Sequence, residues 1–143
     1  MTRLLRILAF GLWTGVMIGF AFLFAPIAFS VLGPVLTFAE LIGRVIGSIT
    51  VFGYACAALV VLAAMLERFA SLRAKITALF AVVMAALGWF EMHAVVPVMR
   101  STPIETPAYQ GLHHESSTIY SAILLLGLAG LVWSAWQEGP NAA

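Results

Sequence analysis

Long apolar runs separated by short polar segments make up most of this 143-residue chain. The runs cover about residues 7–32, 45–66, 76–97 and 112–136. Each has at least the roughly 20 residues that an α-helix needs to cross the hydrocarbon core of a bilayer. Within lipid, an α-helix satisfies all the backbone polar groups of such a segment internally. The pattern therefore predicts an all-α integral membrane four-helix bundle, with residues 1–143 as a single domain.

The composition supports a lipid environment. Hydrophobic residues make up 63% of the chain and charged residues 9%, whereas soluble domains carry roughly 25% charged residues. The net charge is +1, and the basic residues are scattered at helix ends, which excludes a nucleic-acid partner. Cys56 is the single cysteine, so no internal disulfide forms, and we expect it to be a small buried apolar side chain.

The ends of the apolar runs and the segments between them also carry predictions. The first run exceeds the roughly 7–15 residues of a signal-peptide core, so we expect a retained membrane helix, kinked by Pro26. Residues 33–44 mix apolar and polar side chains and predict a brief interfacial helix that leads into the second span. Residues 98–109 predict a polar loop interrupted by Pro103 and Pro107.

Basic residues near the span ends predict the orientation. Four crossings place both termini and the middle connection on one side, which has five basic residues: Arg3, Arg6, Arg68, Arg73 and Lys75. The other side has Arg44 and Arg100. We therefore expect cytoplasmic N- and C-termini in a multi-pass protein of the inner membrane of a bacterium. Trp13, Trp133 and Trp136 lie toward the cytoplasmic ends, where we expect interfacial anchors.

Small residues recur at helical spacing. Gly11, Gly15 and Gly19 lie four residues apart in the first helix, and Gly43 and Gly47 repeat the spacing in the second. Such faces let a neighbouring helix backbone approach closely in lipid. We expect them to pack the helices of the bundle together, with a homo-oligomer or a partner membrane protein as the alternative.

Ionisable residues gather at the outer, non-cytoplasmic end, which has all three histidines and four of the six acidic residues. Glu91 lies six residues before Pro97, about 9 Å along a helix. A lone carboxylate at that depth is expected to face the bundle interior, and to protonate or find a partner. His93 points to the opposite face, because two residues correspond to about 200° of rotation.

The fourth helix adds a polar face, on which Tyr109, His113, Ser116 and Tyr120 follow an i, i+4, i+7, i+11 progression. The candidate ligand-binding residues are therefore Glu91, His93, His113, Ser116 and Tyr120. His93 and His113 are also the metal-ligand candidates, although the Cys/His spacing of a zinc site is absent. A structural role for His113, bonded to loop backbone or to Glu91, and a pH-sensing role remain alternatives.

Three motifs resemble a known family. They are Gly15 followed by Phe24-Ala25-Pro26 and Phe29, the segment Gly43-Arg44-Val45-Ile46-Gly47, and Leu112-His113-His114-Glu115-Ser116. Together they resemble the small four-helix membrane domain called domain of unknown function 4149, typified by transmembrane protein 205. The resemblance implies the fold and singles out His113 and Ser116, but it names no reaction or cofactor. The family often has an asparagine where this chain has Tyr120.

Two functions remain open. One is a binding or transport-type role, in which the outer polar residues hold a metal ion, a haem-like cofactor or a small solute. The other is a structural or assembly role, in which the glycine faces pack against partner helices. No nucleophile with an adjacent base is recognisable, which disfavours an enzyme.

Overall fold

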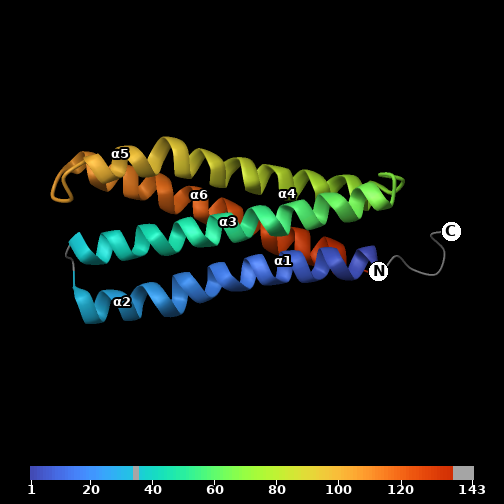
Figure 1. Cartoon of the computed structure of the whole chain (residues 1–143), viewed down its shortest axis with the longest axis horizontal. Coiled ribbons are helices and arrows are strands. Elements are labelled where there is room, and N and C mark those ends of the chain that lie inside the picture. The colour runs from blue at the N-terminus through green and yellow to red at the C-terminus, as the bar shows by residue number, and fades with distance from the viewer. Residues whose placement is uncertain (34–35, 137–143) are drawn as a thin grey trace.

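The computed structural model describes residues 1–33 and 36–136, and for residues 36–39 the backbone alone. Four helical segments run antiparallel along one bundle (Figure 1). They consist of α1 (Thr2–Gly19), η1 (Phe20–Phe24) and α2 (Ala25–Leu32), then α3 (Leu36–Leu66), then α4 (Leu72–Phe90), η2 (Glu91–Val95) and α5 (Val96–Ser101), and finally α6 (Pro107–Ala135). The inner end of the bundle is the one that holds Thr2, residues 67–71 and Ala135; the opposite end is the outer end.

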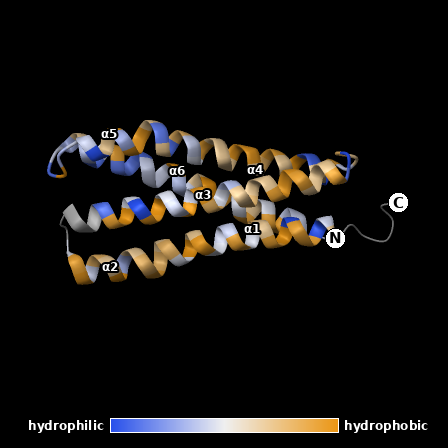
Figure 2. Cartoon of the chain, viewed as in Figure 1, coloured by the Kyte–Doolittle hydropathy of each residue, from blue (hydrophilic) through white to orange (hydrophobic). Residues whose placement is uncertain are grey.

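All four segments are long and apolar enough to cross a membrane. Hydrophobic residues occupy most of their length (Figure 2), and many large apolar side chains are exposed, such as Phe22, Val31, Leu79 and Leu125. A surface with so many exposed apolar side chains is unfavourable in water and is expected in contact with the acyl chains of lipids. The prediction of an all-α, four-span membrane protein is confirmed.

The helices extend further than the apolar runs. α3 is continuous from Leu36 to Leu66, so residues 36–44 belong to the same helix as the second span and form no separate interfacial helix, while Gly33 ends α2. Ser71 and Thr106 cap α4 and α6 by accepting the N–H of Ala74 at 3.1 Å and of Tyr109 at 3.3 Å. Polar caps let helices begin outside the hydrocarbon, where hydropathy gives no signal. The polar tail expected at residues 137–143 lies outside the described residues.

Each long helix packs against two neighbours. α1 and α4 each contact α3 and α6, so the four helices form a closed ring. The closest approaches occur where an aromatic ring covers a glycine: a Cβ on Gly53 would lie 2.5 Å from Trp13, and one on Gly130 would lie 2.5 Å from Phe10. The expectation that Trp13 anchors the interface is wrong, because its ring is 3% exposed and fills the space above Gly53.

The glycines singled out by their spacing lie in more open surroundings. A Cβ on Gly15 or Gly19 would meet nothing within 4 Å. At Gly11, Gly43 and Gly47 the nearest atoms would lie at 3.5 Å or more. Those atoms belong to Leu131 for Gly11, Arg100 for Gly43 and Met92 for Gly47. The tightest helix contacts within the chain therefore involve other glycines.

The first and third segments share one backbone irregularity. Each has a five-residue π-helical turn, and a proline, Pro26 or Pro97, follows two residues after that turn ends. Proline lacks an N–H and its ring clashes with the carbonyl four residues earlier; a locally wider helix relieves that clash. The turns begin 71 residues apart (91 − 20) and the prolines are also 71 apart (97 − 26). The two halves of the bundle thus repeat one helix plan, although no sequence repeat is recognisable.

Candidate functional site

The Glu91 side chain is fully buried in the outer half of the bundle. It is the first residue of η2 and is 0% exposed. The Ser116 hydroxyl of α6 donates a hydrogen bond to Glu91 Oε1 at 2.5 Å. The second carboxyl oxygen, Oε2, is buried and has no hydrogen-bond partner. Half of this carboxyl group is therefore unsatisfied inside the membrane span.

Tyr120 continues the polar surface one turn further along α6. Its hydroxyl lies 3.3 Å from Thr50 Oγ1 on α3. The Thr50 hydroxyl already donates to the carbonyl of Ile46 at 3.0 Å, so Tyr120 must be the donor in the contact between the two side chains. The lone pairs of the Tyr120 oxygen remain available to accept a hydrogen bond or a cation.

Tyr54 lies one turn after Thr50 on α3 and has a buried hydroxyl with no partner. Both residues pack over Gly88, where a Cβ would lie 3.2 Å from Thr50 Cγ2 and 3.9 Å from the Tyr54 ring. Gly88 precedes Glu91 by three residues, so the two share one face of the helix. The hydrogen bonds of Tyr120 with Thr50 and of Ser116 with Glu91 connect α6 to both of the other helices. These contacts bring three helices to one site.

We call this group the Glu91 cluster; its members are Glu91, Ser116, Tyr120, Thr50 and Tyr54. Three of them were candidates from the sequence, and Thr50 and Tyr54 were missed. Their i, i+4 spacing on the second span was the available signal, because polar side chains one turn apart share a helix face.

The two candidate histidines do not reach the cluster. His93 is exposed, stacks on Trp89 with ring centroids 4.7 Å apart, and places Nδ1 2.9 Å from the Trp89 carbonyl. His113 is also exposed and stacks on Tyr109 at 6.4 Å. Ser116, rather than His113, is the partner of Glu91.

The donor set of the cluster is made of oxygens. Within residues 1–33 and 36–136, no group of three or more His, Cys, Asp or Glu side chains could hold a metal ion. Carboxylate and hydroxyl oxygens are hard ligands, which suit protons and hard cations better than zinc or haem iron. The chemistry available here is proton exchange, binding of a small cation, or hydrogen bonding.

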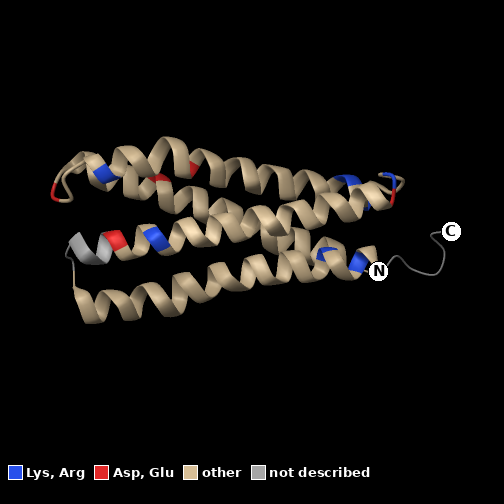
Figure 3. Cartoon of the chain, viewed as in Figure 1, with Lys and Arg blue, Asp and Glu red and all other residues tan. Residues whose placement is uncertain are grey.

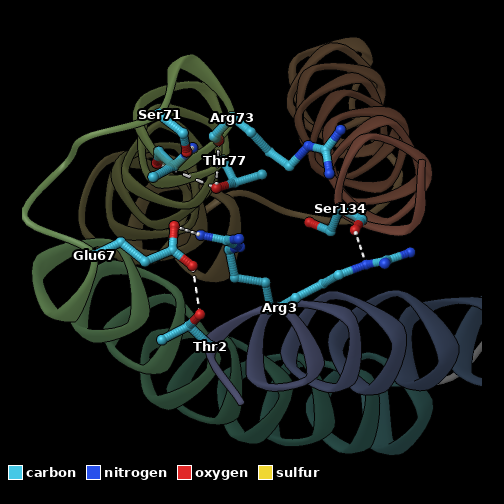
Figure 4. A network of polar contacts seen from close by, with 9 residues as sticks. Thr2, Arg3, Glu67, Ser71, Arg73, Thr77 and Ser134 are labelled. Atoms are coloured by element: carbon cyan, nitrogen blue, oxygen red, sulfur yellow. Dashed lines mark hydrogen bonds and ion pairs between the residues drawn. The ribbon is translucent and has the colours of Figure 1, made fainter. Parts of the chain in front are cut away.

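A second polar network lies at the inner end (Figure 4). Arg6 is 3% exposed and donates through Nη1 to Glu67 Oε2 at 2.7 Å. The Thr2 hydroxyl donates to the other Glu67 oxygen. Burial by itself raises the pKa of the Glu67 carboxyl, but the hydrogen bonds from Arg6 and Thr2 and the nearby positive charges outweigh it, so the pKa is lower than usual.

The family assignment agrees with this architecture. The chain belongs to the family described as Domain of unknown function (DUF4149), whose model matches residues 8–108. The match includes the motifs around Pro26 and Gly43 and ends before Leu112. The comparisons with curated proteins and with solved structures gave no match. The chain is thus a small multi-pass membrane protein of a family whose activity is undefined.

Proposed function

We propose that this protein binds a small hard cation, in the first instance a proton, at the Glu91 carboxyl in the outer half of the bundle. The observation that carries the proposal is the unpartnered Glu91 Oε2, which is buried at membrane depth among hydroxyl groups. Ionisable residues placed in this way commonly mark ion or proton pathways in membrane proteins.

Charge balance supports the proposal. The two ion pairs among the described residues are Arg6–Glu67 and Arg44–Glu40, and neither involves Glu91. An isolated carboxylate taken from water into a medium of low dielectric loses on the order of 20 kcal/mol of solvation by an idealised estimate. A proton on the carboxyl, or a cation beside it, removes that penalty. The hydroxyls of Ser116, Tyr120 and Tyr54 then provide further oxygen ligands.

A surface groove supports access to the site. The groove, of about 600 Å³, is lined by Arg44, Gly47, Ser48, Val51 and Met92. Met92, which lines this groove, follows Glu91 directly in η2. A ligand as small as a proton needs only a transient chain of water between the groove and Glu91.

Infrared difference spectroscopy of the purified protein during a pH titration tests the proposal directly. We expect the carbonyl stretch of a buried protonated carboxyl in the wild type, its loss in Glu91→Gln, and its retention in the matched control Glu115→Gln. Glu115 is an exposed carboxyl next to Ser116. Addition of Na⁺ shifts the titration if a metal cation competes for the site. A spectrum unchanged by Glu91→Gln would refute the proposal.

An assembly role is the second candidate, and it is favoured by the open face of α1. Gly15 is exposed, and nothing lies within 4 Å of a Cβ added there or at Gly19. A second copy, or another membrane protein, would pack against this face. Isoleucine at Gly15 is then expected to abolish crosslinking between copies. A protein that is monomeric in lipid nanodiscs would refute the second-copy form of this role.

We also propose that the inner end faces the cytoplasm of a bacterium, because five basic residues near the inner end outnumber the two at the outer end. Reporter enzymes fused after residues 69 and 104 test this orientation. The first fusion should be active only with a cytoplasmic reporter, and the second only with a periplasmic one. The reverse result would invert the topology.

A further inference from the structure

Among the described residues, lysine and arginine lie near the two ends of the bundle (Figure 3). At the outer end they are Arg44, on α3, and Arg100, on α5. Arg44 Nη2 donates to Glu40 Oε1 at 2.7 Å, and both side chains of this pair are mostly exposed. Within the described part of the chain, no hydrogen bond or ion pair engages Arg100, which is exposed as well. Together these two arginines and one glutamate carry one net positive charge.

Gly43 and Gly47 of α3 face side chains of the third segment at this end. A Cβ on Gly43 would lie 3.5 Å from Arg100 Nη2, and a Cβ on Gly47 would lie 3.5 Å from Met92 Cε. The Arg100 guanidinium therefore lies against α3, about one helical turn outward of Gly47. Gly47 and Met92 line the groove of about 600 Å³, and its other lining residues are Arg44, Ser48 and Val51.

The groove changes from basic to apolar along its length. Arg44 and Arg100 lie close to the outer ends of the candidate spans Glu40–Leu66 and Leu72–Ser101, which is the level of lipid head groups. Val51 lies seven residues further into the span than Arg44, about 10 Å along a helix, and it is 67% exposed. The Ser48 hydroxyl between them donates to the Arg44 carbonyl at 3.2 Å, so the backbone already satisfies this donor. The groove is therefore basic at its outer end and apolar toward the hydrocarbon.

We propose that this groove between α3 and the third segment binds one anionic phospholipid of the outer leaflet. The phosphate lies at Arg100, which supplies the unpaired charge, and at Arg44. One acyl chain lies along Gly47, Val51 and Met92. Guanidinium groups match the geometry of phosphate oxygens particularly well.

A phospholipid suits the groove better than a free anion does. A free phosphate would use the basic end and leave the apolar part unfilled, whereas a phospholipid has a phosphate and an apolar chain in the same order. The printed bond to Glu40 uses one of the five N–H donors of Arg44, so that ion pair can stay in place. The single net positive charge complements the single negative charge of phosphatidylglycerol. The inference does not rest on cation binding by Glu91, although a lipid chain in the groove has to move aside before water enters.

Native mass spectrometry of the full chain, released from detergent with added lipid, tests the proposal. The probes are phosphatidylglycerol, phosphatidylcholine and inorganic phosphate. Near a membrane surface each basic residue strengthens binding by about fivefold. We therefore expect Arg100→Gln to weaken phosphatidylglycerol binding about fivefold. The matched control is Arg68→Gln, which removes an exposed arginine at the inner end and should keep the wild-type affinity.

A second pair of variants tests the groove without changing any charge. Gly47→Leu places a side chain in the groove and should reduce phosphatidylglycerol binding. Gly111→Leu is its matched control, because Gly111 is exposed and a Cβ there would meet nothing within 4 Å. Glu91→Gln should leave lipid binding unchanged, so the lipid site and the cation site can fail separately.

Three results would overturn the proposal. They are equal binding of phosphatidylglycerol and phosphatidylcholine by the wild type, inorganic phosphate binding as tightly as phosphatidylglycerol, and an equal loss in Arg100→Gln and Arg68→Gln. Because Arg100 is exposed and unpaired, Arg100→Gln decides the result if Gly47→Leu does not fold.

Discussion

Removing one partner of the buried Arg6–Glu67 pair should damage the bundle far more than removing both. In Glu67→Leu, the Arg6 guanidinium, whose side chain is 4% exposed, keeps its charge and loses its carboxylate. Breaking a buried pair in this way costs about 3–5 kcal/mol. In Arg6→Met the remaining Glu67 side chain is 24% exposed, so water partly solvates it and we expect a smaller loss.

The double variant Arg6→Met with Glu67→Leu replaces the pair by apolar side chains of similar size. Such replacements are often neutral, or stabilising by about 1–4 kcal/mol. A double-mutant cycle of the wild type, the two single variants and the double variant should therefore show a large favourable coupling energy between Arg6 and Glu67. Free energies of unfolding from reversible denaturation in neutral detergent give all four corners of the cycle. A Glu67→Leu loss within about 0.5 kcal/mol, typical of surface changes, would refute the reasoning.

The same pair predicts a pH dependence. Because the pKa of Glu67 is lower in the folded protein than its usual value of 4.5, the ionised carboxylate stabilises the fold above that value. This contribution is lost as the pH falls through the lowered folded-state pKa. Stability measured from pH 7 downward should therefore fall steeply only in the acid range below the usual value. Glu67→Gln should show a shallower decline there, and parallel profiles for the two proteins would contradict the assignment.

Two matched pairs of variants test the packing of the bundle by the same unfolding measurement. Gly53→Ala should destabilise the protein by about 1–3 kcal/mol because the added methyl group overlaps a buried indole ring. Gly15→Ala should change the free energy of unfolding by no more than about 0.5 kcal/mol. Equal effects of the two variants would show that the helices do not meet at Gly53. Tyr120→Phe should lower stability by about 0.5–1.5 kcal/mol because it removes a hydrogen bond. Tyr54→Phe removes a hydroxyl without a partner and should be neutral or stabilising. A larger loss of stability in Tyr54→Phe than in Tyr120→Phe would contradict the hydrogen-bond assignment.

The spans could be predicted from the sequence because lipid imposes a simple rule: a segment without internal hydrogen bonds or with many charges does not cross. The pairing of Glu91 with Ser116 was only partly predictable. Helical periodicity identified a polar face on each helix but gave no relative rotation of the helices. Burial of Trp13 could not be predicted either, because it depends on Gly53 forty residues away.

A comparison of the two π-helical turns shows whether the backbone irregularity depends on the Glu91 carboxyl. Phe20 begins the π-helical turn of the first segment, just as Glu91 begins that of the third segment (91 − 71 = 20). The turn of the first segment contains only apolar side chains. The turn near Pro26 therefore forms without a carboxylate. Replacing a buried, half-satisfied carboxyl by a packed apolar side chain is commonly neutral or stabilising.

Glu91→Leu should accordingly fold as a bundle at least as stable as the wild type. The freed Ser116 hydroxyl can turn to a carbonyl one turn earlier in α6. Thermal unfolding in detergent measures the change, and Glu115→Leu at an exposed position is the control. If Glu91→Leu lowered stability by several kcal/mol, the cluster would be a structural staple between the third and fourth segments. Retained stability, together with loss of the titrating carboxyl, would leave ligand binding as the reason for placing a carboxyl group in the membrane at this position.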